Sequence, residues 1–338
     1  MKKIFFGILA MAAFAACSNE EQIAAPKGEA ITFGAFVDNS VRATTAADPS
    51  YTAGSLDHFD VYGAVNGVNI FDGDEVTGSV GSNAAWTFTD STTPTQYWIS
   101  GANYTFDAVV DAEAVECDAA GLPKYLVYTA DGETDMLYDR VTTTGKPVEN
   151  DGLVSFAFTH LLSKVKFTVE NTTAEEADNY RYVIEDIKIT NAYASGNYAV
   201  VDQTIDETTV YANTWFNLVG NGTHTIDALT VASATTEVGA KEVLLIPGAS
   251  VGVSFTVDIQ MHNGSQWVSI PMDNSEKTID DVVTLEANKA YNFKVTLGLG
   301  DPIQFTATAL DVWENGNTED TSNPADGVDD IVPVNPAN

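Results

Sequence analysis

One segment of the sequence matches a catalytic signature. Gly248-Ala249-Ser250-Val251-Gly252 has the G-x-S-x-G spacing of the hydrolase nucleophile elbow, in which a serine lies between a strand and a helix. The residues after Gly252 alternate as a strand instead, and Pro247-Gly248 is typical of a hairpin turn. The only histidine further along the chain, His262, lies on that following strand. The segment therefore predicts a turn and not a nucleophile.

The sequence also lacks a convincing metal site. Asp131-Gly132-Glu133-Thr134-Asp135 places carboxylates at alternate positions, as a calcium loop does, but Met136 and Thr142 stand where an EF-hand needs Gly and Glu. Among 48 acidic residues such clusters arise by chance. No spacing typical of metal ligands relates the four histidines, which are His58, His160, His224 and His262. We therefore expect solvated acidic loops, with no metal and no cofactor.

The first residues predict export and lipidation. Lys2 and Lys3 precede an uncharged apolar run, Ile4 to Ala16, which is shorter than the roughly 20 residues of a membrane-spanning helix. This arrangement is typical of a signal peptide, here residues 1–16. Phe14-Ala15-Ala16-Cys17 resembles a bacterial lipobox, so we expect Cys17 to carry lipid in the outer membrane. Cys117 would then have no partner for a disulfide bond.

The charge of the chain excludes some classes of partner. The formal net charge is −33, and removal of Lys2 and Lys3 with the signal peptide would make it about −35. Nucleic acids and anionic membrane surfaces need clustered Lys and Arg, so we expect neither as a partner. With 44% hydrophobic residues the chain can still bury a substantial core.

Period-two alternation dominates the rest of the chain. It is clear at Tyr104, Phe106, Ala108 and Val110, and it is longest from Val251 to Met261. Alternating side chains point to opposite faces of a strand, so each such run has one buried and one wet face. Turn pairs such as Asn66-Gly67 and Asn263-Gly264 separate the runs. The pattern predicts an all-β protein of antiparallel sandwiches.

The predicted strands divide into two similar halves. The division falls near residues 159–163, which gives an N-terminal domain of residues 30–160 and a C-terminal domain of residues 161–317. Residues 17–29 would tether the lipid to the fold. Residues 318–338 are rich in Asn, Asp and Pro, and we expect them to form a flexible acidic tail.

Short motifs along nearly the whole chain resemble those of the fimbrillin family (Mfa-like type V pilins). They occur in this order: the lipobox, segments 31–36 and 41–44, Tyr97-Trp98, segments 104–106 and 158–165, segments 244–248 and 291–295, and Asp311-Val312-Trp313. The resemblance implies two tandem transthyretin-like antiparallel β-sandwich domains. It also implies a non-enzymatic lipoprotein that assembles with other subunits into surface fimbriae. An adhesive role further implies a receptor on a host or bacterial surface.

The resemblance also implies maturation by proteolysis. A first strand in the precursor would fill a groove in the N-terminal sandwich, with its alternate residues Ile31, Phe33, Ala35 and Val37. An arginine-specific protease would cut between Arg42 and Ala43, and the strand would leave together with the lipid. A neighbouring subunit would then donate a replacement strand, which is the β-augmentation mode of recognition. Arg42 is the only basic residue between Ala30 and Pro123.

The sequence leaves the donor and the position in the fibre open. One candidate donor is the alternating strand with Ile303, Phe305, Ala307 and Ala309, and another is the tail segment 328–334. A stalk subunit must donate a strand, a tip subunit need not, and an anchor subunit would keep its lipid.

The second hypothesis is a surface glycan-binding lipoprotein of a polysaccharide-uptake system. An exposed, coplanar set of aromatic rings would favour it, and the candidates are Trp86, Trp98, Trp215, Trp267 and Trp313. A hydrolase would need a carboxylate pair or a triad in a cleft, and no motif indicates one.

Overall fold

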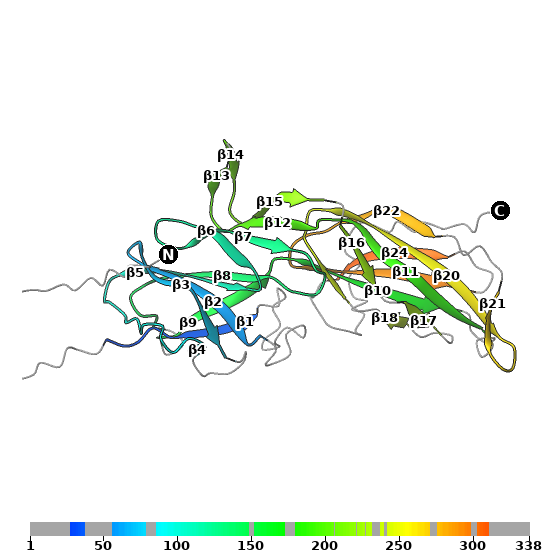
Figure 1. Cartoon of the computed structure of the whole chain (residues 1–338), viewed down its shortest axis with the longest axis horizontal. Helices are drawn as coiled ribbons and strands as arrows, with labels where there is room; N and C mark the ends of the chain where they lie inside the picture. Colours follow the sequence, from blue (N-terminus) through cyan, green and yellow to red (C-terminus); the bar gives the residue numbers. More distant parts are fainter. Residues whose placement is uncertain are drawn as a thin grey trace, which may run out of the picture.

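The computed structural model describes residues 28–37, 56–78, 86–148, 152–172, 180–205, 207–220, 222–226, 228–231, 237–239, 242–270, 276–298 and 303–310. In these ranges the protein is an elongated array of strands, with the N-terminal strands at one end and the C-terminal strands at the other (Figure 1). The predicted lipidation site Cys17 and cleavage site Arg42-Ala43 lie outside the described residues, as does the tail.

The N-terminal half is built on a seven-stranded sheet that curls almost into a barrel. Its strand order is β1-β9-β8-β5-β2-β3-β4, so β1 and β4 are the two edges. Trp86, directly before β4, donates a hydrogen bond from its backbone N to Phe33 O of β1 at 2.9 Å. β1 therefore closes the barrel, and we call it the closing strand. The strands are β1 Phe33–Val37, β2 His58–Val65, β3 Val68–Thr77, β4 Thr87–Phe88, β5 Asn103–Val110, β8 Leu137–Thr144 and β9 Val154–His160.

Aromatic residues fill this barrel. The alternation predicted along β5 is present, since Tyr104 and Phe106 are fully buried in the core. Gly63 on the neighbouring β2 faces this core, because an added Cβ would come within 2.7 Å of the Phe71 ring and 3.1 Å of the Phe106 ring. A glycine here lets the two rings pack directly against the backbone.

A four-stranded sheet covers the outer face of β5 and β8. Its order is β15-β12-β7-β6. Val109 and Tyr138, which point away from the barrel core, pack with Leu126 and Tyr198 in a second apolar cluster beneath it. The strands are β6 Glu113–Cys117, β7 Pro123–Thr129, β12 Ser195–Ala199 and β15 Thr214–Val219.

This sheet combines strands from both sides of residue 160. β12 pairs with β7 from Ser195 opposite Thr129 to Ala199 opposite Tyr125. This pairing joins strands from both sides of the expected boundary between residues 30–160 and 161–317. The division into these two domains stays a prediction. Between β12 and β15, the short strands β13 Gln203–Ile205 and β14 Thr208–Val210 form a hairpin that projects from the body (Figure 1).

The C-terminal half is a sandwich of two sheets. One has the order β18-β10-β23-β24, with β19 paired to β10; the other has the order β16-β11-β20-β21, with β17 on β11 and β22 on β20. Phe167 of β10 and Phe255 of β20 meet between them, with ring centroids 6.0 Å apart. The strands are β10 Ser163–Asn171, β11 Tyr180–Ala192, β16 Gly222–Ile226, β17 Leu229–Val231, β18 Glu237–Gly239, β19 Val243–Leu245, β20 Ser250–His262, β21 Trp267–Ser269, β22 Lys277–Thr284, β23 Lys289–Leu297 and β24 Gln304–Leu310.

The expected all-β class is confirmed. Most neighbouring strands are antiparallel, as expected, but β1 with β9 and β10 with β23 are parallel pairs. Within the described ranges, no helix has the length and apolar character needed to cross a membrane.

Candidate functional site

The predicted first strand lies in the wall of the barrel. On one side the closing strand follows β9 in parallel, with Phe33 opposite Val154 and Val37 opposite Phe158. Just before it, Val154 N donates to Thr32 O at 2.9 Å. Each residue along this side is thus held in a fixed register.

The other side of the same segment is also hydrogen-bonded. Ile31 N donates to Gln96 O at 2.9 Å, and Trp98 N donates to Glu29 O at 3.0 Å. Together with the bond from Trp86 N to Phe33 O, these contacts make the segments at 86 and 96–98 a second wall. Residues 29–37 therefore lie in a groove between β9 and this second wall.

The side chains of the closing strand complete the barrel core. Phe33 is 1% exposed and Ile31 4%, while Ala35 packs partly buried against the same core. Four rings surround Phe33, with centroids 5.5–6.0 Å away: Phe71, Phe88, Phe106 and Phe156. These burials support the prediction that Ile31, Phe33 and Ala35 belong to the inward face, while the burial of Val37 lies outside the description.

The groove is strongly apolar once the strand is removed. Burial of Ile31 and Phe33 is worth about 1.5–3 kcal/mol each, and each backbone hydrogen bond adds about 1 kcal/mol net. An empty groove would expose four aromatic rings and two rows of unpaired backbone groups. Such an edge is a template for another strand.

An ion pair lies where the chain enters the groove. Lys146, on the segment after β8, binds the carboxylate of Glu29. The side chains are 31% and 66% exposed, so the pair contributes at most about 1 kcal/mol. The pair instead helps to position the chain, because it holds Glu29, just before the closing strand, against the segment that follows β8.

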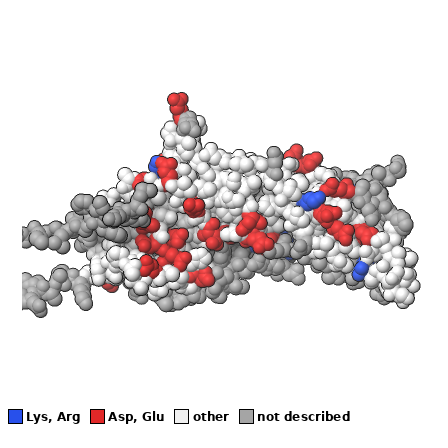
Figure 2. Space-filling view, in the orientation of Figure 1, with Lys and Arg blue, Asp and Glu red and all other residues white. Residues whose placement is uncertain are grey.

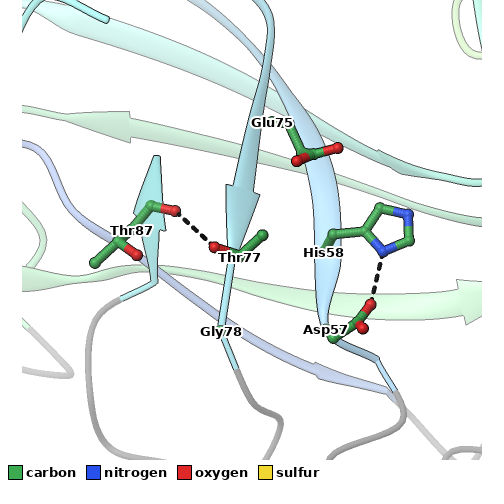
Figure 3. Close-up of a pocket in the computed structure, with 6 residues that line it drawn as sticks. All are labelled: Asp57, His58, Glu75, Thr77, Gly78 and Thr87. Atoms are coloured by element: carbon green, nitrogen blue, oxygen red, sulfur yellow. Dashed lines mark hydrogen bonds and ion pairs between the residues drawn. The ribbon is translucent and has the colours of Figure 1, made fainter. Parts of the chain in front are cut away.

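A surface cavity lies beside the barrel seam (Figure 3). It is lined by Asp57, His58, Glu75, Thr77, Gly78 and Thr87 and has a volume of about 590 Å³. His58 Nδ1 lies 2.7 Å from Asp57 Oδ1, and this hydrogen bond is the main reason why the pKa of His58 is raised. At its edge, Gly78 packs on the Trp86 indole, where an added Cβ would approach within 2.4 Å. The cavity thus adjoins Trp86, whose backbone N is hydrogen-bonded to the closing strand. Among the six lining residues, no nucleophile is paired with a base.

Two of the three arginines of the chain are held inside strands. Arg140 on β8 forms a bidentate pair with the buried Asp107, with Nε–Oδ1 and Nη2–Oδ2 distances of 2.5 and 2.6 Å. Arg181 on β11 donates to Gln260 Oε1 at 2.6 Å and stacks on the Trp267 ring at 4.7 Å. Arg42, the third, lies outside the described residues.

The candidate donor strand is an edge strand of its own sheet. β24 pairs only with β23 in the described sheet, from Gln304 opposite Thr296 to Leu310 opposite Ala290. Phe305 is buried, Ile303 and Ala307 are partly buried, and Ala309 is exposed. The assignment of this strand as a donor stays a prediction, and it requires β24 to leave β23.

The serine motif has no catalytic geometry. The chain turns at Pro247-Gly248, and β20 begins at Ser250 and ends at His262. These two residues stand at opposite ends of a strand, about 40 Å apart at about 3.3 Å per residue. Ser250 therefore has no contact with His262.

The acidic loop and His160 have partners within the protein. Asp131 accepts hydrogen bonds from the backbone of Glu133 and Thr134, both at 2.8 Å, so its carboxylate caps its own loop. His160 is buried with its Nδ1 2.5 Å from Asp135 Oδ2. Among the described residues, no group of three or more His, Cys, Asp or Glu side chains is arranged to hold a metal ion.

The described tryptophans do not form an aromatic platform. Trp86 is buried, and Trp98 packs against the barrel core. Trp215 donates from Nε1 to Leu161 O at 3.2 Å beneath the four-stranded sheet, and Trp267 is covered by Arg181. Within the described part of the chain, the feature that would favour glycan binding is not observed.

Sequence reasoning missed the second wall of the groove and the ion pair. Trp86 and Gln96 lie in irregular segments with no alternation, and Lys146 is 117 residues from Glu29. The motif Tyr97-Trp98 was the one signal that pointed to this wall.

Two solved structures with TM-scores of 0.50 and 0.51 share the fold. A fimbrial protein from Bacteroides vulgatus aligns with 14% identity and a TM-score of 0.50, over 83% of this chain and 99% of that one. A candidate cell adhesion protein from Bacteroides ovatus aligns with 17% identity and a TM-score of 0.51, over 87% and 99%. The fimbrial anchor protein Mfa2 from Porphyromonas gingivalis aligns with 11% identity and a TM-score of 0.39, over 86% and 100%.

A search of curated protein sequences finds no match. In contrast, the sequence model described as fimbrillin-like matches residues 42–311, which is most of the chain. That family is structural, so the expectation of a non-enzymatic protein is confirmed. Membership of the family also supports a subunit of cell-surface fimbriae that associates with other subunits. The resemblance carried by the short motifs is thereby confirmed, and the chain belongs to the fimbrillin-like family.

Proposed function

We propose that the chain is a polymerising subunit of adhesive surface fimbriae that matures by loss of its closing strand. The precursor is lipidated at Cys17 and held in the outer membrane. An arginine-specific protease cuts between Arg42 and Ala43, and residues 17–42 leave with the lipid. A strand from a neighbouring subunit then fills the groove, and repetition of this step builds the fibre.

The observation that carries this proposal is the position of the closing strand. It is hydrogen-bonded on both sides, it supplies Phe33 to the centre of the barrel core, and Arg42 follows Val37 by five residues. A cut at Arg42 would leave the strand attached by non-covalent contacts alone. Its loss would leave a groove that only another apolar strand can fill.

The surroundings of the other arginines support a single cut. A protease needs an extended, accessible segment around the arginine, whereas Arg140 and Arg181 lie within paired strands and bind Asp107 and Gln260. Arg42 would then be the preferred site of an arginine-specific protease in the folded chain.

The surface charge supports a requirement for strand exchange. Groups of acidic side chains lie over both halves of the face shown in Figure 2, and basic ones are few. With a net charge of −33, two copies repel each other at long range, although salt screens this repulsion beyond about 8–10 Å. A stable contact between copies therefore needs extensive burial of apolar surface, which an exchanged strand supplies.

The test is digestion of purified precursor with an arginine-specific protease, followed by mass spectrometry and native gels. We expect one early cut after Arg42 and then a ladder of oligomers. The matched control is Arg42→Lys, which keeps the charge but removes the recognised residue, and it should give neither the cut nor the ladder. A cut with no ladder would contradict polymerisation and indicate a tip subunit. An uncut, lipidated monomer would contradict the proposal and favour an anchor or the glycan-binding lipoprotein.

A further inference from the structure

Polar and aromatic side chains gather on the outer face of the sandwich, on the strands β11, β20 and β21. We call them the outer cluster, which consists of Arg181 on β11, Gln260 and His262 on β20, and Trp267 and Ser269 on β21. Their chain neighbours Tyr182 and Ile259 pack in the sandwich core, so side chains one position along the same strands point outward. The β20–β21 hairpin lies at the end of the molecule opposite the N-terminal barrel (Figure 1).

The Arg181 guanidinium is held in a fixed plane. Its Nε donates to Gln260 Oε1 at 2.6 Å, and its Cζ lies 4.7 Å from the centre of the Trp267 ring. Gln260 is fixed in turn, because its Nε2 donates to Asp258 Oδ2 at 2.7 Å. The same oxygen accepts from Ser269 Oγ at 2.8 Å. The side chains around Arg181 are therefore arranged before any ligand arrives.

The ring beneath Arg181 is also held in place. Asn263 closes the turn between β20 and β21, since its backbone N donates to Gln266 O and its Oδ1 accepts from Ser265 N, both at 3.1 Å. This turn sets His262 opposite Trp267, and the two rings meet at 61° with centroids 5.1 Å apart. Both side chains are only half-buried, so part of this aromatic corner is open to solvent.

The two described arginines differ in what their terminal nitrogens bind. Arg140 grips both carboxylate oxygens of Asp107 through Nε and Nη2. At Arg181 the amide of Gln260 takes Nε, and among the residues that the structure describes no carboxylate pairs with Nη1 or Nη2. This is notable in a chain with 48 acidic and 15 basic residues. The two terminal nitrogens form a planar fork of donors, which fits a carboxylate.

The surroundings of this fork favour a sugar acid over a carboxylate on a peptide. The open parts of the Trp267 and His262 rings offer apolar surface to the C–H groups of a pyranose. Ser269 and Gln260 offer hydroxyl and amide groups, which can exchange hydrogen bonds with sugar hydroxyls. An acidic peptide side chain would use the fork alone.

We propose that the outer cluster is a binding site for a carboxylate-bearing sugar, such as a uronic acid. The sugar carboxylate binds Nη1 and Nη2 of Arg181, and its ring lies against the open parts of Trp267 and His262. Asp258 is a positioning residue, because it holds Gln260 and Ser269. This inference deepens the adhesive part of the proposed function by naming the class of receptor, and it rests on that part alone, since binding needs no cleavage.

The test measures sugar binding to the uncut precursor, made with Cys17→Ser, by saturation-transfer NMR. The probe is methyl β-glucuronide, and its neutral match is methyl β-glucoside. Arg181→Gln removes the fork, and Arg181→Lys keeps the charge but not the fork. The matched control is Lys289→Gln, which removes one exposed cation at the start of β23. Urea unfolding of each variant shows that it remains folded.

We expect the glucuronide to bind the parent chain and the Lys289→Gln variant equally. Its affinity should fall about tenfold or more in both Arg181 variants, because a charge-assisted pair of hydrogen bonds is lost. The glucoside should bind the parent chain more weakly by a similar factor.

Glucuronide binding that the Arg181 variants leave unchanged would overturn the site. Acetate or N-acetylglutamate that binds as tightly as the glucuronide would overturn the choice of a sugar, as would equal binding of the glucoside. Absence of binding by every probe would overturn the whole inference. None of these results bears on strand exchange, because cleavage after Arg42 and the ladder of oligomers are measured separately.

Discussion

Replacement of Phe33 by alanine tests whether the closing strand completes the barrel core. Phe33 is 1% exposed and is surrounded by four aromatic rings, so Phe33→Ala leaves a cavity that those rings cannot fill without moving. Truncation of a buried phenylalanine costs about 3–5 kcal/mol. The free energy of unfolding of the precursor should fall by that amount, which weakens docking of the strand by about two to three and a half orders of magnitude.

The assay is urea unfolding followed by tryptophan fluorescence. Trp86 is a suitable reporter because it donates to Phe33 O and its ring lies 4.7 Å from that of Phe59 in the same core. The matched control is Thr32→Ala on the adjacent, partly buried position, whose side chain points to the other face of the strand. It should change the free energy of unfolding by about 0.5 kcal/mol or less.

The decisive comparison is between the precursor and the cleaved protein. Once residues 1–42 have been released, the Phe33→Ala chain and the parent chain are the same molecule, so their unfolding curves should coincide. A loss below about 1 kcal/mol in the precursor would refute the assignment of Phe33 to the core. A difference that persists in the purified cleaved form would refute release of the strand.

Three further substitutions test the surroundings of the groove. Asp107→Asn leaves the Arg140 guanidinium without its charged partner. We expect the free energy of unfolding, measured in urea, to fall by about 3–5 kcal/mol, and mass spectrometry to show a second cut by the arginine-specific protease. A stable, singly cut variant would contradict this. Burial raises the pKa of Asp60, so the folded state favours its protonated form, and its contribution to stability is full at acid pH and is lost as the pH rises through the raised pKa. Asp60→Asn should therefore raise the melting temperature at pH 7 and have no effect at pH 3, and a lower melting temperature at pH 7 would contradict the reasoning. Gly78→Ala forces a Cβ against the Trp86 indole and should cost about 1–3 kcal/mol, measured as a lower urea midpoint of the precursor; an unchanged midpoint would show that the indole is free to move.

Local alternation predicted strands and many of their inward residues, but it did not predict the second buried face of β5 at Val109 or the exposure of Met261 at the end of the longest run. Tyr104 and Phe106 on β5, and Val251 to Val257 on β20, are buried at the alternate positions that the sequence indicates. The reason is geometric, because the side-chain period of a strand is a property of its own backbone. The class of the fold follows from many such runs and their turns.

The partners of each strand could not be predicted in the same way. The parallel pairing of β1 with β9 joins residues more than 100 positions apart, and the pairing of β12 with β7 carries a strand from beyond residue 160 back over the N-terminal barrel. Both depend on which exposed edges meet in space, and the alternation of one strand contains no such information. The ion pair of Glu29 with Lys146 is non-local for the same reason.

The covalent link between the closing strand and β2 explains why the proposed precursor would remain a monomer. While the link is intact, the closing strand competes for its groove at the effective concentration of a tethered segment, which is in the millimolar range for short flexible linkers. A candidate donor strand on a second copy, such as β24, is present at a far lower concentration and must also leave β23. A cut at Arg42 removes the tether, so rebinding of the released strand becomes bimolecular and dilution disfavours it. The donor strand, in contrast, stays attached to a whole folded subunit that gains further contacts as the fibre grows. In the proposed mechanism, one peptide bond therefore decides whether the groove is filled from within the chain or by its neighbour.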